Sequence, residues 1–190
     1  METNPTVAQM TDEELVQNIV KGNNILLFEE IYDRYSKAIY NKCRSFSKSN
    51  VEAEDLTQDV FLLLFVKLGS FKGRSKFSSW VYSFTYNFCV NYVNRNKARK
   101  ISDKSDPISN TSEKVSNDVD DDSLFEMRFV KFKKALQLIS PEDKTILLLK
   151  YQDNVSIKEL TILMKVSESA VKMRLKRAKT RILEIYNKLP

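Results

Sequence analysis

Six cationic side chains lie close together near the C-terminus, between positions 172 and 181. Apolar residues at 171, 175, 178 and 182 run through the same segment in steps of three and four, which predicts a helix with one buried face. Cations on the other faces could pair with phosphate while the helix lies in the major groove of DNA. The pattern is equally typical of a solvated basic surface. The six residues are Lys172, Arg174, Lys176, Arg177, Lys179 and Arg181.

The residues before this helix favour the DNA-binding interpretation. Ser156 and Ser167 are helix-capping residues, and they predict a short helix over 156–163, a turn, and a long helix over 168–188. These dimensions are typical of a helix-turn-helix, whose second helix reads base edges with its first residues and phosphates with its flanks. The candidate DNA contacts are Ser167, Ser169, Lys172, Met173, Arg174, Lys176 and Arg177.

A second candidate site lies on a predicted helix over 51–68. Its residues Asp55, Gln58, Asp59 and Leu62 are spaced so that they share one face, while Leu56, Val60, Leu63 and Leu64 can face the core. The helix is apolar over more than half of its circumference, so it lies deep in a core or contacts a partner. An acidic face with large apolar neighbours suits a basic protein surface. The alternative is that these acids only stabilise the N-terminal end of the helix.

A third candidate site combines cations with aromatic rings. Lys72, Arg74 and Lys76 alternate with Phe71 and Phe77 in a predicted loop, and Trp80, Asn87, Asn91 and Arg95 follow on a predicted helix over 78–99. Cations interleaved with rings are typical of single-stranded nucleic-acid binding, in which unstacked bases lie on aromatic side chains. At helical spacing, however, rings such as Phe84 and Phe88 are more typical of a core.

The elements that carry these sites predict an all-α protein. Only 3 Gly and 4 Pro occur in 190 residues, a composition that favours long helices. Residues 101–124 lack aromatic residues and have a net charge of −5, which predicts a flexible acidic linker. The linker divides the chain into two small helical domains, 1–100 and 125–190. The second domain has a net charge of +8. The predicted helices span 12–21, 25–46, 51–68 and 78–99, then 124–139, 141–151, 156–163 and 168–188.

Other patterns argue against several classes of protein. The chain has no histidine and only two cysteines, Cys43 and Cys89. We therefore expect neither a histidine-based catalytic triad nor a metal site. Its three glycines cannot form a phosphate-binding loop or a dinucleotide-binding motif, so we expect no cofactor. Carboxylate-only or lysine-based catalysis remains open, but no motif supports it. The N-terminus lacks the pattern of a secretory signal, and the longest apolar run, 60–66, is too short to span a bilayer. We therefore expect a cytoplasmic protein that does not bind membranes.

Taken in order, these segments resemble the extracytoplasmic-function (ECF) group of sigma-70 family sigma factors over nearly the whole chain. The run AEDLTQDVFL at 53–62 resembles the helix with which the family binds RNA polymerase. The run FSSWV at 77–81, with the later Asn87 and Arg95, resembles the helix that opens and reads the minus-ten promoter element. The runs at 156–160 and 166–175 resemble the reader of the minus-thirty-five element.

The resemblance implies a non-enzymatic transcription initiation factor. Asp55, Gln58 and Asp59 would contact the clamp coiled coil of the polymerase β′ subunit, which favours the partner-binding interpretation of the acidic face. The loop from Phe71 to Lys76 would capture a flipped base of the non-template strand, and the C-terminal domain would bind duplex DNA. Further partners that the resemblance implies are the β flap of the polymerase and a regulatory anti-sigma factor. The acidic linker would pass through the channel that later carries RNA.

The sequence also departs from the family pattern. Lys165 stands at the turn position that usually holds glycine, so a non-glycine residue is expected to adopt a positive φ there. Ala170 replaces a usual threonine, and Asn91 replaces a usual aspartate. Two other functions fit parts of the pattern. One is a helix-turn-helix transcriptional regulator that acts without core polymerase, and the other is a helical adaptor whose basic helix binds acidic partners.

Overall fold

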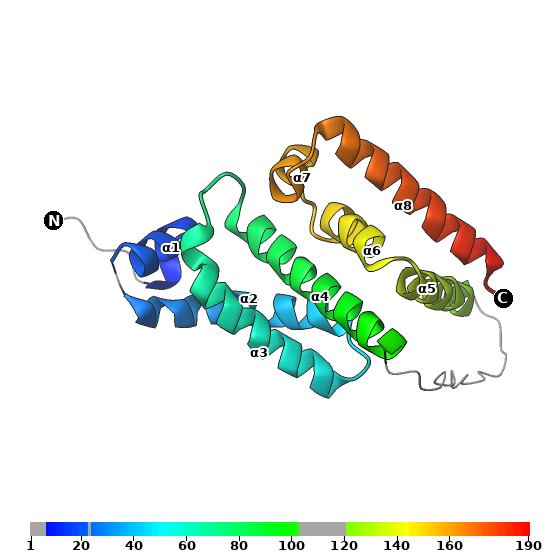
Figure 1. Cartoon of the computed structure of the whole chain (residues 1–190), viewed down its shortest axis with the longest axis horizontal. Coiled ribbons are helices and arrows are strands. Elements are labelled where there is room, and N and C mark those ends of the chain that lie inside the picture. The colour runs from blue at the N-terminus through cyan, green and yellow to red at the C-terminus, as the bar shows by residue number, and fades with distance from the viewer. Residues whose placement is uncertain (1–6, 23, 103–120) are drawn as a thin grey trace.

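The structure is a computed structural model that describes residues 7–22, 24–102 and 121–190, with side chains described at 7–22, 24–98 and 129–190. No strand occurs in these ranges, so the prediction of an all-α protein with two helical domains is confirmed (Figure 1). The N-terminal domain contains α1 (Asp12–Val20), α2 (Phe28–Arg44), α3 (Asn50–Lys67) and α4 (Phe77–Ser102). The C-terminal domain contains α5 (Asp121–Leu138), α6 (Pro141–Leu147), α7 (Ile157–Met164) and α8 (Glu168–Lys188). Short 3₁₀ turns at Val7–Gln9, Ile25–Leu27 and Leu68–Ser70 and a π-helical turn at Leu148–Gln152 complete the described elements.

Capping residues begin most of these helices where the sequence predicts. Thr11 and Glu14 form a reciprocal capping box at the start of α1, with the Thr11 amide donating to the Glu14 carboxylate at 2.7 Å. Ser156 and Glu159 form the same arrangement at α7, and the Ser140 hydroxyl accepts from the Asp143 amide at the start of α6. Each capping bond satisfies a backbone donor that the helix itself cannot pair.

Helical structure extends a short way into the predicted linker at both ends. The helix α4 continues to Ser102, because no Gly or Pro interrupts it. The helix α5 begins at Asp121. Residues 101–102 and 121–124 are therefore helical. The rest of the predicted linker, 103–120, lies outside the described residues.

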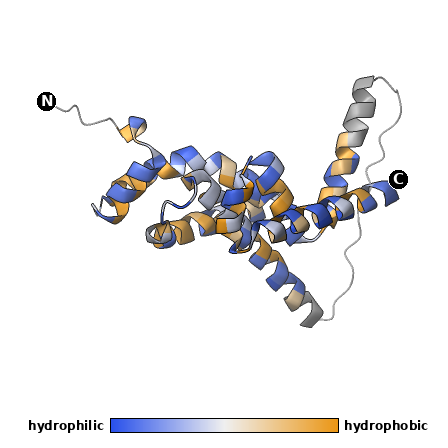
Figure 2. Cartoon of the chain, turned by 90° about the horizontal axis from the view of Figure 1, so that it is seen from above, coloured by the Kyte–Doolittle hydropathy of each residue, from blue (hydrophilic) through white to orange (hydrophobic). Residues whose placement is uncertain are grey.

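Each domain has its own apolar core. In the N-terminal domain, Leu15, Ile31, Ile39, Val60 and Leu64 from α1, α2 and α3 are fully buried together. In the C-terminal domain the buried set comes from α5 to α8 and includes Ala135, Ile146, Leu160, Val171 and Ala178. Figure 2 shows hydrophobic and hydrophilic residues mixed along the helices, as expected of helices that bury one face. Burial of these helical faces supplies the main driving force for folding.

The two domains also contact each other, and α4 provides most of the contact. Tyr86 of α4 is fully buried among the core residues of the C-terminal domain. The Lys42 ammonium on α2 lies 2.6 Å from the Asp153 carboxylate, with both side chains at most 5% exposed. The Lys144 ammonium on α6 donates to the Ser45 carbonyl. Residues far apart in the chain therefore build one polar, partly aromatic interface between the domains.

Lys144 gives this interface a measurable signature. Burial against the N-terminal domain lowers the pKa of its ammonium from 10.5 to about 8. Below pH 8 the contact must bury a cation, so the interface is expected to gain stability as the pH rises from 8 toward 10.5. Nitrogen-15 NMR of the lysine side chains should show one ammonium that titrates near pH 8 and is absent in Lys144→Met. Titration of Lys144 at or above pH 10 would contradict its burial.

Candidate nucleic-acid and protein interfaces

The acidic face of α3 is exposed along its whole length. The side chains of Asp55, Gln58, Asp59 and Leu62 are all exposed, with Leu62 at 67%. On the opposite side of the helix, Leu56, Val60 and Leu64 are buried against α2 and α4, as the spacing predicts. The helix thus separates a buried apolar face that stabilises the domain from an acidic face that is exposed to solvent.

Leu63 does not follow the sequence prediction. It was expected to face the core but is 40% exposed, because it lies about 100° around the helix from the buried Leu64. Val66 is 71% exposed and extends the same apolar surface. Together with Leu62, these residues form an apolar border beside the three polar residues of the acidic face. The sequence signal for this border is the uninterrupted apolar run at 60–66, which a single buried face of a helix cannot accommodate.

The start of α4 is held by a stack of aromatic rings. Phe71 lies 5.2 Å from Phe77 and 5.5 Å from Trp80, and Trp80 stacks on Phe84 at 5.7 Å, measured between ring centroids. Phe77 is fully buried, whereas Phe71, Trp80 and Phe84 are half-buried. The expectation that rings at helical spacing pack on the core is confirmed for Phe84 and Phe88. The aromatic stack therefore packs the end of the cationic loop, at Phe71, against the first turns of α4.

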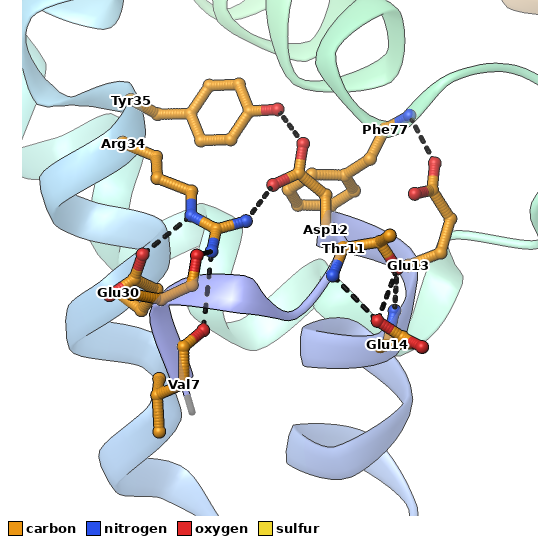
Figure 3. A network of polar contacts seen from close by, with 10 residues as sticks. Val7, Thr11, Asp12, Glu13, Glu14, Glu30, Arg34, Tyr35 and Phe77 are labelled. Carbon is orange, nitrogen blue, oxygen red and sulfur yellow. Dashed lines mark hydrogen bonds and ion pairs between the residues drawn. The ribbon is translucent and has the colours of Figure 1, made fainter. Parts of the chain in front are cut away.

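A polar network fixes the same end of α4 to the rest of the domain (Figure 3). The Glu13 carboxylate accepts from the Phe77 amide at 3.2 Å, and the Tyr35 hydroxyl donates to Asp12 at 2.5 Å. Burial and the Asp12 carboxylate raise the pKa of Tyr35. Arg34 binds Asp12 at 2.9 Å and Glu30 at 2.7 Å. These bonds position α1 against α2 and against the first turn of α4.

The cationic loop directly precedes the exposed residues of α4 in the chain. Lys72, Arg74 and Lys76 are exposed, and Gly73 adopts a φ of 66° at the turn between the first two. On α4, the spacing places Trp80, Asn87, Asn91 and Arg95 within about 80° of the helix surface. The asparagines and Arg95 are exposed. The predicted residues of the third site on α4 therefore share one face of the helix, and Trp80 at its first turn contacts Phe71 of the loop.

The predicted helix-turn-helix is present in α7 and α8. The Ser167 hydroxyl accepts from the Ala170 amide at 3.3 Å and starts α8, whose buried face is formed by Val171, Leu175, Ala178 and Ile182. Ser169, Met173, Lys176 and Arg177 lie on the face opposite this seam and are exposed. Met173 is 54% exposed, so an apolar side chain lies at the centre of a cationic face. The predicted contacts Ser167, Lys172 and Arg174 are exposed beside them, with Lys172 paired to Glu168 at 2.6 Å.

Lys165 occupies the left-handed conformation that its position in the turn predicts. Its φ of 54° and ψ of 44° cost a non-glycine residue about 1 kcal/mol relative to glycine. Lys165→Gly is therefore expected to raise the free energy of unfolding by about 0.5–1 kcal/mol. The control is Lys165→Ala, which removes the same side chain but keeps Cβ and should give no such gain. Chemical denaturation compares the three proteins, and equal stability of the Gly and Ala variants would contradict the prediction.

Two contacts join the helix-turn-helix to the cationic loop of the other domain. The Glu159 carboxylate on α7 accepts from the Lys76 amide at 3.3 Å and from the Ser79 hydroxyl at 3.0 Å. Partial burial opposes the charge of Glu159, but hydrogen bonds from Ser156, Ser79 and Lys76 outweigh it and lower its pKa. An ionised carboxylate of one predicted DNA-binding element therefore lies at the first turn of the other.

The comparisons with known proteins agree with this arrangement. Residues 31–99 match the family model for sigma-70 region 2, and residues 129–182 match the model for sigma-70 region 4. The chain is 25% identical to the ECF RNA polymerase sigma factor SigW of Bacillus subtilis, over 90% of this chain and 94% of that protein. It is 26% identical to the ECF RNA polymerase sigma-E factor of Escherichia coli, over 92% and 93% of the two chains.

Two solved structures have the same fold. The sigma factor RpoE of Bartonella quintana, in complex with the anti-sigma factor NepR, superposes with a TM-score of 0.59 at 22% identity, over 86% of this chain and 98% of that one. CnrH, in complex with the cytosolic domain of CnrY, gives a TM-score of 0.61 at 20% identity, over 93% and 97%.

The chain belongs to the sigma-70 family of RNA polymerase sigma factors, within its ECF group. It is a factor for transcription initiation, and the alternative of a regulator that acts without polymerase is not favoured. No helix in the described part of the chain is long and apolar enough to cross a membrane.

Proposed function

We propose that three surfaces divide the work of a sigma factor. The acidic face of α3, with Asp55, Gln58, Asp59 and Leu62, binds core polymerase at the clamp coiled coil of β′. The loop from Phe71 to Lys76 and the exposed face of α4 bind the minus-ten element and its non-template strand. The helices α7 and α8 bind the minus-thirty-five element as duplex DNA. Catalysis of RNA synthesis belongs to the polymerase, so the chain itself is not an enzyme.

The observation that carries this proposal is a difference in charge between two exposed helix faces: the face of α3 is acidic and the face of α8 is cationic. An acidic face bordered by exposed Leu62, Leu63 and Val66 repels DNA and suits a basic protein. The face of α8 combines Lys176 and Arg177 with Met173. Cationic side chains of this kind bind phosphate or guanine, and an apolar side chain can contact the thymine methyl group. The chain thus offers separate surfaces for a protein and for DNA.

An apolar groove supports the proposal of an anti-sigma partner. The groove encloses about 830 Å³ between α5, α6, α8 and the end of α2. Its apolar lining includes Phe129, Phe132, Leu136 and Leu148, and its cations are Arg44, Lys133, Lys144 and Lys179. An amphipathic helix with acidic flanks would fit such a surface. We propose that an anti-sigma factor binds in this groove. Its binding would compete with docking of the C-terminal domain on the β flap of the polymerase. We place both events in the cytoplasm, where transcription occurs.

Run-off transcription with purified core polymerase tests the proposed function. Core polymerase supplemented with this chain should produce transcripts from promoters selected out of a genomic library, and core polymerase alone should not. A regulator without polymerase would instead bind DNA tightly by itself and add no promoter-dependent transcript. Absence of any such transcript across the library would refute the proposed function.

A further inference from the structure

The two cysteines of the chain are 46 residues apart in sequence and meet inside the N-terminal domain. Cys43 lies in the last turn of α2 and Cys89 in the middle of α4, and both side chains are fully buried. The Cys89 thiol donates to the Cys43 sulfur at 3.9 Å, so the two sulfur atoms are in direct contact. The part of the chain that the structure describes holds no group of ligands that could make this pair a metal site.

The two thiols are close enough to be joined by local movement. An S–S bond is about 2.05 Å long, so the sulfur atoms need to approach each other by roughly 2 Å. A rotation about χ1 of one cysteine, or a small shift of α2 against α4, supplies a movement of this size. The helices α2 and α4 already pack against each other in one core. Formation of the bond therefore requires no change of fold.

We propose that Cys43 and Cys89 form a reversible disulfide when the protein meets a hydroperoxide. In the first step the Cys43 thiolate attacks one oxygen of the hydroperoxide and the O–O bond breaks. Cys43 becomes a sulfenic acid, and the departing alkoxide or hydroxide takes up the proton that Cys43 released. In the second step the Cys89 sulfur attacks the Cys43 sulfur, the S–O bond breaks, and hydroxide leaves with the Cys89 proton as water. Two thiols lose two electrons in total, and one hydroperoxide is reduced.

The surroundings of the two thiols support this order of attack. The hydrogen bond from Cys89 lowers the pKa of the Cys43 thiol by more than burial raises it. Donation of the same hydrogen bond raises the pKa of Cys89, and burial raises it further. The thiolate is the nucleophilic form of cysteine, so Cys43 is the attacking thiol and Cys89 the resolving one. Because both thiols are buried, the hydroperoxide reaches them only through local opening of the core, and the reaction is slow.

The disulfide closes a loop that contains both proposed sites of the N-terminal domain. Residues 44–88 include the acidic face of α3, the cationic loop and the first half of α4. A cross-link over a loop of this length restricts the unfolded chain and thereby stabilises the folded domain. A compartment that keeps thiols reduced leaves such a pair open, so the bond marks oxidising conditions and holds these surfaces in their folded form. The bond forms whether or not the chain acts with polymerase.

Mass spectrometry of the peroxide-treated full-length protein tests for the disulfide. After treatment the protein is unfolded, alkylated with N-ethylmaleimide and digested. Most molecules should resist alkylation and yield one peptide pair in which Cys43 is linked to Cys89 within a chain. Dithiothreitol added after the peroxide should restore two alkylated cysteines. Two free thiols at a dose that fully oxidises the exposed Met173 would overturn the inference, as would sulfonic acids without a disulfide.

Single-cysteine variants test the roles of the two thiols. Cys89→Ala leaves Cys43 without a resolving partner, so peroxide should produce a sulfenic acid that dimedone traps. Cys43→Ala is the matched control, and its remaining thiol should give at least tenfold less dimedone adduct. Equal yields, or a larger yield from Cys43→Ala, would overturn the assignment of Cys43 as the attacking thiol. Circular dichroism shows whether both variants are folded, and valine replaces alanine where a cavity unfolds the domain.

Thermal unfolding measures the effect of the bond on stability. The oxidised parent should unfold about 10 °C above the reduced parent, and dithiothreitol should abolish the difference. Cys43→Ala carries the same five methionines but cannot form the bond, so peroxide should not raise its midpoint. The comparison of oxidised with reduced parent needs no variant. An oxidised parent that unfolds at the same temperature as the reduced one, or below it, would overturn the stabilising role of the disulfide.

Discussion

Replacing Asp55 and Asp59 together by lysine is expected to lower the affinity of the protein for core polymerase by about 100-fold or more. Both side chains are exposed on the acidic face of α3, and reversal of two charges turns attraction to a basic surface into repulsion. Truncation of one buried interfacial charge typically costs about 2–5 kcal/mol, and two reversals should at least reach this range. Fluorescence anisotropy of the labelled protein, titrated with core polymerase, measures the change.

A charge-matched control distinguishes the effect of the acidic face on affinity from the effect of the net charge of the protein. Glu29 and Asp33 are exposed acids on α2, four residues apart, and replacing both by lysine changes the net charge by the same amount. This control should keep the parental affinity within about threefold, because the two exposed acids lie on a different helix from the acidic face and are screened by salt. Unaltered circular dichroism and thermal unfolding of both variants would show that the fold is intact. An equal loss of affinity in the two variants would mean that α3 is not the docking face.

Local signals explain why the helices could be predicted so closely. Ser156 with Glu159, Thr11 with Glu14 and Ser140 before Pro141 each mark a helix start through bonds within four residues, so no knowledge of the tertiary fold is needed. Positive φ at Lys165 was instead expected from the resemblance, because the family usually has glycine at this turn position. The differences from prediction occur where a local signal is weak, as at the ends of α4 and α5.

The candidate sites were predictable to the extent that they follow helical periodicity. The exposed face of α3 and the seam of α8 are set by spacing alone, whereas the exposure of Leu63 depends on where α2 and α4 pack. The interdomain contact could not be predicted at all. Lys42 and Asp153 are 111 residues apart, and neither lies in a motif that indicates a partner. Their pairing depends on how the two domains pack against each other, which helical periodicity does not encode.

The second large effect is expected on the cationic face of α8. Lys176→Ala combined with Arg177→Ala should weaken binding to minus-thirty-five duplex DNA by about 30-fold or more at low salt. Both residues lie opposite the buried seam of α8 and are exposed, so their loss removes contacts to phosphates or base edges without disturbing the core. One such contact to a base is typically worth about 1–3 kcal/mol.

The salt dependence distinguishes a phosphate contact from a general loss of structure. Each phosphate that a cation neutralises contributes about 0.9 to the slope of the logarithm of affinity against the logarithm of salt concentration. If Lys176 and Arg177 both contact phosphates, the double variant should reduce that slope by about 2. If Arg177 reads a base instead, the slope should fall by about 1 and discrimination between promoter sequences should relax.

The control variant removes two cations that lie elsewhere in the same domain. Lys134 on α5 and Lys188 at the end of α8 are exposed and lie away from the first turns of α8. Lys134→Ala with Lys188→Ala gives the same change in net charge, so its affinity and slope should remain close to the parental values. A similar decrease in both double variants would assign DNA binding to the overall charge of the domain. A decrease confined to Lys176 and Arg177 would assign it to the exposed face of the recognition helix.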